Sequence, residues 1–282
     1  MWEWLGTGFL SEDFTFAREV LQRGTGAVYV VAFIAALRQF PALLGERGLL
    51  PAPRFLGLVS VRQAPSLFHW RYSDRLLRTV AWLGLILSAA VIAGLPQAGP
   101  WWVPMLVFLA LYGLYLSIVN VGQVFYGFGW ESLLLETGFL AAFLGSHQTG
   151  VPLVTLFAFR WLLFRVEFGA GLIKLRGDTV WRDLTALDYH HETQPMPGPL
   201  SWFFHHLPRP LHRIEVLANH VVQLLVPVLL FFPQPIATWA AGAVVITQLW
   251  LVLSGNFAWL NWVTVLLAFA AVSDGVHGFA PA

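Results

Sequence analysis

The feature that most constrains this chain is a series of apolar runs, each long enough to cross a lipid bilayer. A membrane-spanning helix needs about 20 mostly apolar residues, and suitable windows lie near residues 26–44, 79–95, 101–119, 128–145, 152–174, 216–232, 236–254 and 256–272. Only 11% of the 282 residues are charged and 57% are hydrophobic, whereas soluble domains carry about 25% charged residues. We therefore predict an all-α, polytopic transmembrane helical bundle with about eight spans, and we exclude a conventional soluble enzyme.

Short turns and two long polar loops connect these windows. The connections around 96–100, 146–152 and 233–235 are short, so the helices that they join should be antiparallel neighbours. The long polar loops cover 45–78 and 175–215. The first of them is rich in arginine, so the positive-inside rule places it in the cytoplasm. With four predicted spans between the two loops, the second loop should lie on the same side of the membrane.

The first 25 residues predict an interfacial lead-in. Acidic and basic residues interrupt every apolar run there, so the segment lacks the apolar core of a secretory signal and should stay on the mature protein. We predict that residues 1–282 form one membrane domain, with no soluble domain after the last span.

Composition also restricts partners and location. The net charge of +1 argues against nucleic acid as a partner, because nucleic-acid binding needs a clustered excess of Lys and Arg. Without cysteine, the chain has no disulfide, thiolate nucleophile or Cys-bound metal. Lys174 is the only lysine among 16 basic residues, a bias typical of GC-rich bacterial genomes, and no glycosylation sequence is present. We expect a multi-pass protein of the bacterial inner membrane, or of the endoplasmic reticulum membrane if the chain is eukaryotic.

The fifth apolar window carries four ionisable residues at membrane depth. It contains Arg160, Arg165, Glu167 and Lys174, and each unpaired charge near mid-membrane costs about 2.5–3.5 kcal/mol. Arg160, Glu167 and Lys174 follow one another at intervals of seven residues, about two helical turns, so they share one stripe. Arg165 points roughly 140° away from that stripe. Two faces of this helix are therefore polar.

The preceding window supplies counter-charges for these residues. Glu131 and Glu136 lie in it, and we expect Arg160 or Arg165 to pair with one of them. Two interpretations stay open: an ion-pair network that holds helices together, or a functional site, which is the default for ionisable residues inside a membrane. Lys174 lies near a helix end and can also extend its ammonium group to the interface.

The second long loop concentrates groups that can act as acids, bases or metal ligands. These are Asp188, His190, His191, Glu192, His205, His206 and His212. Their spacing matches no common zinc motif, so we expect no metal and no cofactor. The alternative is that the histidines cap helix ends or bond to backbone carbonyls. The run from Gln194 to Pro199 predicts a rigid extended segment.

The sixth window begins with polar residues and ends with apolar ones. Residues 216, 219, 220 and 223 share one helical face, and Asn219, His220 and Gln223 are polar. This face either lines a polar cleft toward the second long loop or hydrogen-bonds to a neighbouring helix.

Several of these segments resemble the lipase maturation factor family. They read WESLLLETGFL at 130–140, RWLLFRVEFGAGLIKLRGDTVWRDLTALDYHHETQPMPGP at 160–199, HHLPRPLHRIEVLANHVVQLLVP at 205–227 and SGNFAWLNW at 254–262. The resemblance is strong between about 120 and 265 and weaker but collinear over the first 100 residues. It implies a multi-pass membrane protein that, in animals, resides in the endoplasmic reticulum and helps dimeric secreted lipases to fold and assemble. It implies no established catalytic reaction.

The family pattern matches mostly polar residues. They are Trp130, Glu131, Leu134, Glu136, Arg160, Arg165, Gly169, Gly171, Lys174, Arg176, Gly177, Trp181, Asp183, Asp188, His190, Glu192, Gln194, Pro195, His205, His206, His212, Arg213, Glu215, Asn219 and His220. The chain departs from the pattern at Gln223, where the family has glutamate, and it lacks a counterpart to the animal proteins' large soluble C-terminal domain. The resemblance also implies that the loop at 175–215 is lumenal, on the side opposite to the charge-based prediction.

Two functions follow from these observations. The first, implied by the resemblance, is a chaperone or assembly factor that contacts membrane lipids and a secreted lipase client, with Trp202, Phe203 and Phe204 exposed for that client. The alternative is an intramembrane enzyme or lipid-binding protein, similar in layout to the membrane half of vitamin K-dependent carboxylases. It predicts a closed polar cavity between the fifth and sixth spans. The candidate catalytic residues are Glu167, Lys174, Asp188 and His190.

Overall fold

The computed structural model describes residues 9–194 and 196–277, which are mostly helical. Within these residues, four helices are long and apolar enough to cross a membrane: α2 (Thr15–Leu44), α4 (Asp74–Ile92), α5 (Trp102–Val119) and α12 (Ile236–Ser254). The chain is therefore a helical integral membrane protein, as predicted, although eight spans are not confirmed.

The other apolar windows form shorter or more polar helices. Their bounds are α6 (Gly129–Ala141), α7 (Leu153–Arg176), α10 (Arg209–Leu224), α11 (Val226–Leu229) and α13 (Leu260–Ala268). At 24 residues α7 is long enough to span, and its charged residues set it apart from the four apolar helices. The remaining helices are α3 (Ala52–Leu56), α8 (Thr179–Arg182), α9 (Ser201–His205) and α14 (Asp274–His277). Strands β1 (Leu10–Ser11) and β2 (Val151–Pro152) pair antiparallel, with Leu10 opposite Pro152.

The described residues form two compact units. Unit 1 comprises residues 9–12 and 18–155, and unit 2 comprises 13–17, 156–194 and 196–277. That the whole chain forms a single membrane domain stays a prediction.

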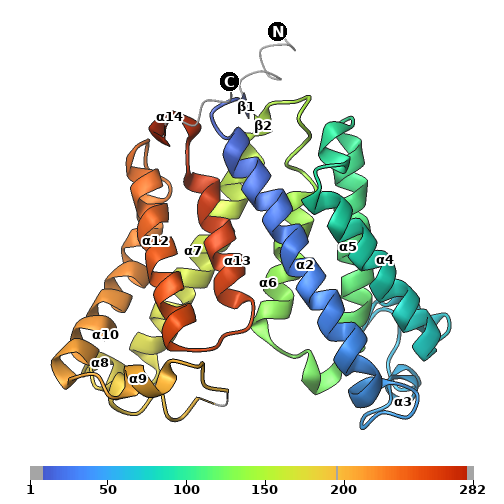
Figure 1. The fold of residues 1–282 in the computed structure, drawn as a ribbon, viewed down its shortest axis with the longest axis horizontal. Helices are drawn as coiled ribbons and strands as arrows, with labels where there is room; N and C mark the ends of the chain where they lie inside the picture. The colour runs from blue at the N-terminus through green and yellow to red at the C-terminus, as the bar shows by residue number, and fades with distance from the viewer. Residues whose placement is uncertain (1–8, 195, 278–282) are drawn as a thin grey trace. The chain divides into compact units, whose positions relative to one another are not determined.

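The core of unit 1 is an aromatic cluster. The ring of Tyr115 on α5 contacts the rings of Tyr29 and Phe33 on α2, with centroids 5.7 and 5.5 Å apart. All three side chains are fully buried. The helix α4 approaches this cluster through Gly84, whose missing Cβ would lie 2.3 Å from the Phe33 ring. In Figure 1, α4 and α5 run side by side, which confirms that the short connection near 96–100 joins neighbouring helices.

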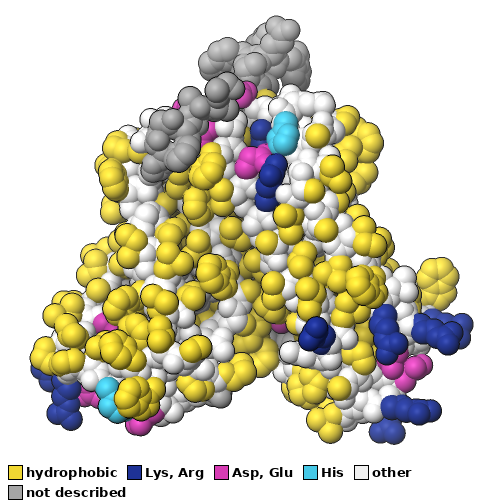
Figure 2. Space-filling view, viewed as in Figure 1, with side chains coloured by type: hydrophobic (Ala, Val, Ile, Leu, Met, Phe, Trp, Pro, Cys, Tyr) yellow, Lys and Arg dark blue, Asp and Glu magenta, His cyan; other side chains and the backbone are white. Residues whose placement is uncertain are grey.

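The polarity of α10 in unit 2 is reversed relative to a helix of a soluble protein, which buries its apolar face. Its buried residues include His212, Asn219, His220 and Gln223, whereas Leu211, Ile214, Leu217 and Val221 are exposed. Hydrophobic atoms likewise cover much of the visible surface in Figure 2, while Lys and Arg side chains gather around α3 in unit 1. An apolar exterior around a polar interior is expected where lipid replaces water.

The helix boundaries differ from the predicted windows at several places. The predicted lead-in at 1–25 lies partly outside the described residues, and its residues from Thr15 onward belong to α2. The two long loops are shorter than predicted, because α4 begins at Asp74 and α10 begins at Arg209. The sixth span is interrupted after Leu224, where Pro227 cannot donate a helical hydrogen bond.

Candidate functional site

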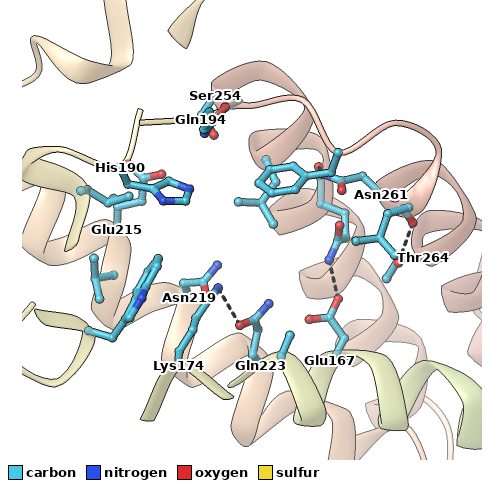
Figure 3. Close-up of a pocket in the computed structure, with 18 of the residues that line it drawn as sticks. Glu167, Lys174, His190, Gln194, Glu215, Asn219, Gln223, Ser254, Asn261 and Thr264 are labelled. Carbon is cyan, nitrogen blue, oxygen red and sulfur yellow. Dashed lines mark hydrogen bonds between the residues drawn. The ribbon is translucent and has the colours of Figure 1, made fainter. Parts of the chain in front are cut away.

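Unit 2 contains a partly open cavity of about 200 Å³, and several polar side chains contribute to its lining. Side chains from α7, α10, α12, α13 and the loop between α7 and α9 line it. In Figure 3, Lys174 and Glu167 lie along one edge of the cavity, and Gln194 and Ser254 lie along the opposite edge. The alternative hypothesis predicted a closed polar cavity walled by the fifth and sixth spans. The cavity of unit 2 is partly open, and α12 and α13 line it together with α7 and α10.

Lys174 reaches the cavity from the last turn of α7 and is held on three sides. Its Nζ donates hydrogen bonds to Asn219 Oδ1 at 2.6 Å and to Gln223 Oε1 at 3.0 Å. The same ammonium lies 4.9 Å from the centroid of the Trp181 ring, close enough for a cation–π interaction. Lys174 therefore does not extend freely into the interface. Gln223 serves as a neutral acceptor for this cation.

Glu167 lies two turns before Lys174 on the same face of α7, so both residues of this predicted stripe reach one cavity. Its side chain is fully buried. Oε1 accepts a hydrogen bond from Gln248 Nε2 at 2.6 Å, while Oε2 has no hydrogen-bond partner among the described residues. Burial of a carboxylate oxygen without a donor costs free energy, so this atom is available to a ligand.

The loop after α8 contributes His190, His191 and Gln194 to the cavity wall. Burial, and then the charge of Lys174, lowers the pKa of His190. Burial, reinforced by the neighbouring histidines, lowers the pKa of His191 to about 4. Both imidazoles are therefore neutral near pH 7, and Lys174 supplies the positive charge of the cavity.

The other acidic and histidine residues predicted in this loop interact outside the cavity. Asp188 lies 3.6 Å from His212 Nδ1 and 3.9 Å from Arg209 Nε. Glu192 lies 3.5 Å from His205 Nε2. Asp188 thus pairs with Arg209 and lies next to His212, and Glu192 lies next to His205; none of these residues lines the cavity.

Two of the predicted loop histidines and His220 on α10 hydrogen-bond to backbone carbonyls, and for the loop histidines this was the second interpretation. His206 bonds to the carbonyl of Trp202, His212 to that of Phe204, and His220 to that of Trp181. Within the described part of the chain, no group of three or more His, Cys, Asp or Glu side chains is placed to hold a metal ion.

Arg160 interacts with backbone carbonyls and an aromatic ring of unit 2. Its Nε donates to the carbonyl oxygen of Ala270 at 2.9 Å, its Nη1 lies 3.4 Å from that of Leu230, and the guanidinium lies over the Phe14 ring. In unit 1, Glu131 is buried and accepts a hydrogen bond from the Tyr115 hydroxyl. The pairing of Arg160 or Arg165 with Glu131 or Glu136 stays an expectation.

The sequence analysis missed several residues of the cavity. These are Gln248 and Ser254 on α12 and Asn261 and Thr264 on α13. They are among the few polar residues of two mostly apolar windows. Because a polar side chain inside a membrane must find a partner, these four positions carried a usable signal.

The fold and the cavity together define a helical integral membrane protein with a polar site among its helices. The comparisons with known proteins then give the family. The family model of the lipase maturation factor transmembrane domain matches residues 16–279, and the chain belongs to this family. It is 41% identical over 288 residues to lipase maturation factor 1 of Bos taurus, which covers 94% of this chain and 50% of the relative.

Other relatives are likewise matched over most of this chain but over only part of their own length. Lipase maturation factor 1 of Homo sapiens is 41% identical, with 94% of this chain and 50% of the relative covered. Lipase maturation factor 2 of Homo sapiens is 36% identical, with 91% of this chain and 40% of the relative covered. The chain thus spans about half the length of the factor 1 relatives that it matches. No solved structure matches it.

Proposed function

We propose that this chain acts as the membrane domain of a lipase maturation factor and assists the folding or assembly of a secreted lipase. The observation that carries the proposal is the family match, which covers residues 16–279. The cavity supplies no competing assignment, because its polar groups fit a binding site as well as a catalytic one.

The helix α9 offers the apolar surface that a client-binding function requires. Trp202 is 73% exposed and Phe203 is 58% exposed. Phe204, which we predicted to be exposed with them, is buried and packs edge-on against Trp250 with ring centroids 5.1 Å apart. We therefore assign client contact to Trp202 and Phe203 and a structural role to Phe204.

The test is deletion of the gene in its host, followed by measurement of secreted lipase activity on a triacylglycerol emulsion per amount of secreted lipase protein. We expect this specific activity to fall and to return with the wild-type chain. The double variant Trp202→Ala/Phe203→Ala should restore it only in part. A matched control is Trp70→Ala in the loop before α4, since Trp70 is 95% exposed but lies in the other long loop. Unchanged specific activity after deletion would contradict the proposal.

We also propose that α6, α7, α10–α11 and α13 complete eight crossings, with the two long loops on one side of the membrane. The reversed polarity of α10 supports this arrangement. Because the chain has no cysteine, single cysteines can report the side directly. Leu58→Cys and Trp202→Cys place thiols at positions 85% and 73% exposed. An impermeant maleimide should label both from the same side, whereas labelling from opposite sides would mean an odd number of crossings between them.

The second candidate function, a lipid-binding protein, rests on a different observation. The cavity contains the buried Glu167 and Lys174, and assistance to a client does not by itself require them. The family match favours the first function, and a lipid site is compatible with it.

A further inference from the structure

A second concavity lies next to the cavity and differs from it in character. This groove, of about 320 Å³, lies between α10 and α12, and its apolar lining includes Leu211, Ile214, Ala218, Ile246 and Trp250. Glu215 and Asn219 line both the groove and the cavity, so the two spaces adjoin. The cavity carries most of the polar side chains and the groove few of them, which matches the division of a lipid into head group and acyl chain.

The cavity lacks hydrogen-bond donors at two buried acceptors. Glu167 Oε2 and the amide oxygen of Gln194 are both shielded from solvent and have no hydrogen-bond partner among the described residues. Both side chains line the cavity and are labelled in Figure 3. The ring nitrogens of His191, which also lines the cavity, are likewise buried and without a hydrogen-bond partner among the described residues. A head group that donates hydrogen bonds can satisfy the two oxygens.

The charges of the cavity favour a cation. Its ionisable lining residues are Glu167, Glu215 and Lys174, together with the neutral His190 and His191, so two carboxylates face a single ammonium group. Lys174 already donates to Asn219 and Gln223, which leaves it little capacity for an added anion. A primary ammonium would balance the charge and supply three N–H donors.

We propose that the cavity and the groove together bind one amine-headed phospholipid, with its ammonium group between Glu167 and Gln194 and an acyl chain in the groove. This site goes beyond the assignment to lipase maturation and does not depend on it. Because the proposal concerns binding alone, it can fail while assistance to a client stands, and the reverse also holds.

The first test compares three dioleoyl phospholipids on the purified full chain by native mass spectrometry. Phosphatidylethanolamine carries N–H donors, phosphatidylcholine has the same charge without them, and phosphatidylglycerol is anionic. We expect phosphatidylethanolamine to bind at least about tenfold more tightly than either of the others, since a hydrogen bond to a charged group changes affinity by about this factor or more. Equal binding of phosphatidylcholine, a preference for phosphatidylglycerol, or no retained lipid would overturn the proposal.

Two variants test the two halves of the site. Glu167→Gln should reduce the preference for phosphatidylethanolamine about tenfold, while Glu192→Gln, an exposed carboxylate outside the cavity, should leave it unchanged. Ala218→Trp should fill the groove from its exposed side and weaken binding of this lipid. Leu249→Trp, an exposed position of α12 that lines neither space, is its control.

The groove variant keeps the test decisive if Glu167→Gln fails to fold. Ala218 and Leu249 are both exposed, so neither substitution disturbs the interior. If Ala218→Trp binds phosphatidylethanolamine as tightly as Leu249→Trp does, the groove does not hold the acyl chain and the proposal is wrong.

Discussion

The close approach of α4 to the aromatic cluster of unit 1 allows a quantitative test of the packing. In Gly84→Ala, the new Cβ would lie 2.3 Å from carbon atoms of the Phe33 ring, roughly 1.2 Å short of ordinary van der Waals contact. Phe33 cannot easily withdraw, because it is fully buried and contacts the rings of Tyr29 and Tyr115. The variant must shift either α4 or the cluster.

Overpacking of this kind costs about 1–3 kcal/mol. Replacing glycine by alanine within a helix stabilises the helix by up to about 1 kcal/mol. We therefore expect the free energy of unfolding to fall by about 1–2 kcal/mol in total. For chains of this size, each kcal/mol lowers the melting temperature by about 2–4 °C. The protein in detergent should therefore melt several degrees below the wild type when its unfolding is followed by intrinsic tryptophan fluorescence.

The matched control is Gly113→Ala in α5, where a Cβ would meet no atom within 4 Å. This variant should melt at or slightly above the wild-type temperature. In addition, Phe33→Leu should recover part of the loss when combined with Gly84→Ala, because the smaller side chain makes room for the methyl group. If Gly84→Ala is as stable as Gly113→Ala, the helix α4 does not pack against Phe33 as described.

Three further predictions concern buried polar groups. Arg18 donates to the carbonyl oxygens of Ser146 and Thr149, both at 2.6 Å, so Arg18→Gln should destabilise unit 1 by about 2–3 kcal/mol, measured as the melting temperature. His191 has a pKa of about 4 in the folded protein against an ordinary 6.5, so the unfolded chain takes up a proton at a higher pH than the folded protein does. Its stabilising contribution, up to about 3 kcal/mol, is present above pH 6.5 and is lost as the pH falls through 4. The melting temperature of His191→Gln should therefore depend less on pH than that of the wild type. Asp274 Oδ2 accepts hydrogen bonds from the N–H and hydroxyl groups of Thr15, so Asp274→Ala should cost about 1–2 kcal/mol and speed amide exchange at the start of α2.

Each of these predictions has its own control. Arg23→Gln removes an arginine that is 46% exposed and pairs with Glu19, and it should cost less than Arg18→Gln. If the melting temperature of His191→Gln depends on pH as strongly as that of the wild type, another group causes the loss of stability at low pH. Asp274→Asn keeps a hydrogen-bond acceptor, so its amide exchange rate at the start of α2 should lie between those of the wild type and Asp274→Ala. An unchanged exchange rate in Asp274→Ala would mean that the Asp274 side chain does not stabilise the start of α2.

Periodicity placed the face of α10 correctly. Residues 216, 219, 220 and 223 are all buried, as their helical spacing predicts. Periodicity did not predict the break after Leu224 or the start at Arg209. A hydropathy window sums the free energies of transfer of side chains from water, and it does not register the backbone hydrogen bond that Pro227 cannot donate. Likewise, the charged residues in the fifth window predicted a polar site, but the three residues of the predicted stripe do not all reach it. Glu167 and Lys174 meet at the cavity, whereas Arg160 bonds to the carbonyl oxygen of Ala270.

The amino-acid sequence by itself determined that this chain is a helical membrane protein, since apolar runs with so few charges cannot be solvated in water. It also determined that Glu167 and Lys174 share a helical face, because a spacing of seven residues is close to two turns. Only the tertiary structure decided which groups face them. Gln248, Gln194 and Asn219 come from three distant segments, and no local spacing in a sequence specifies which helices pack together. The cavity and its two donor-free acceptors are consequences of that packing.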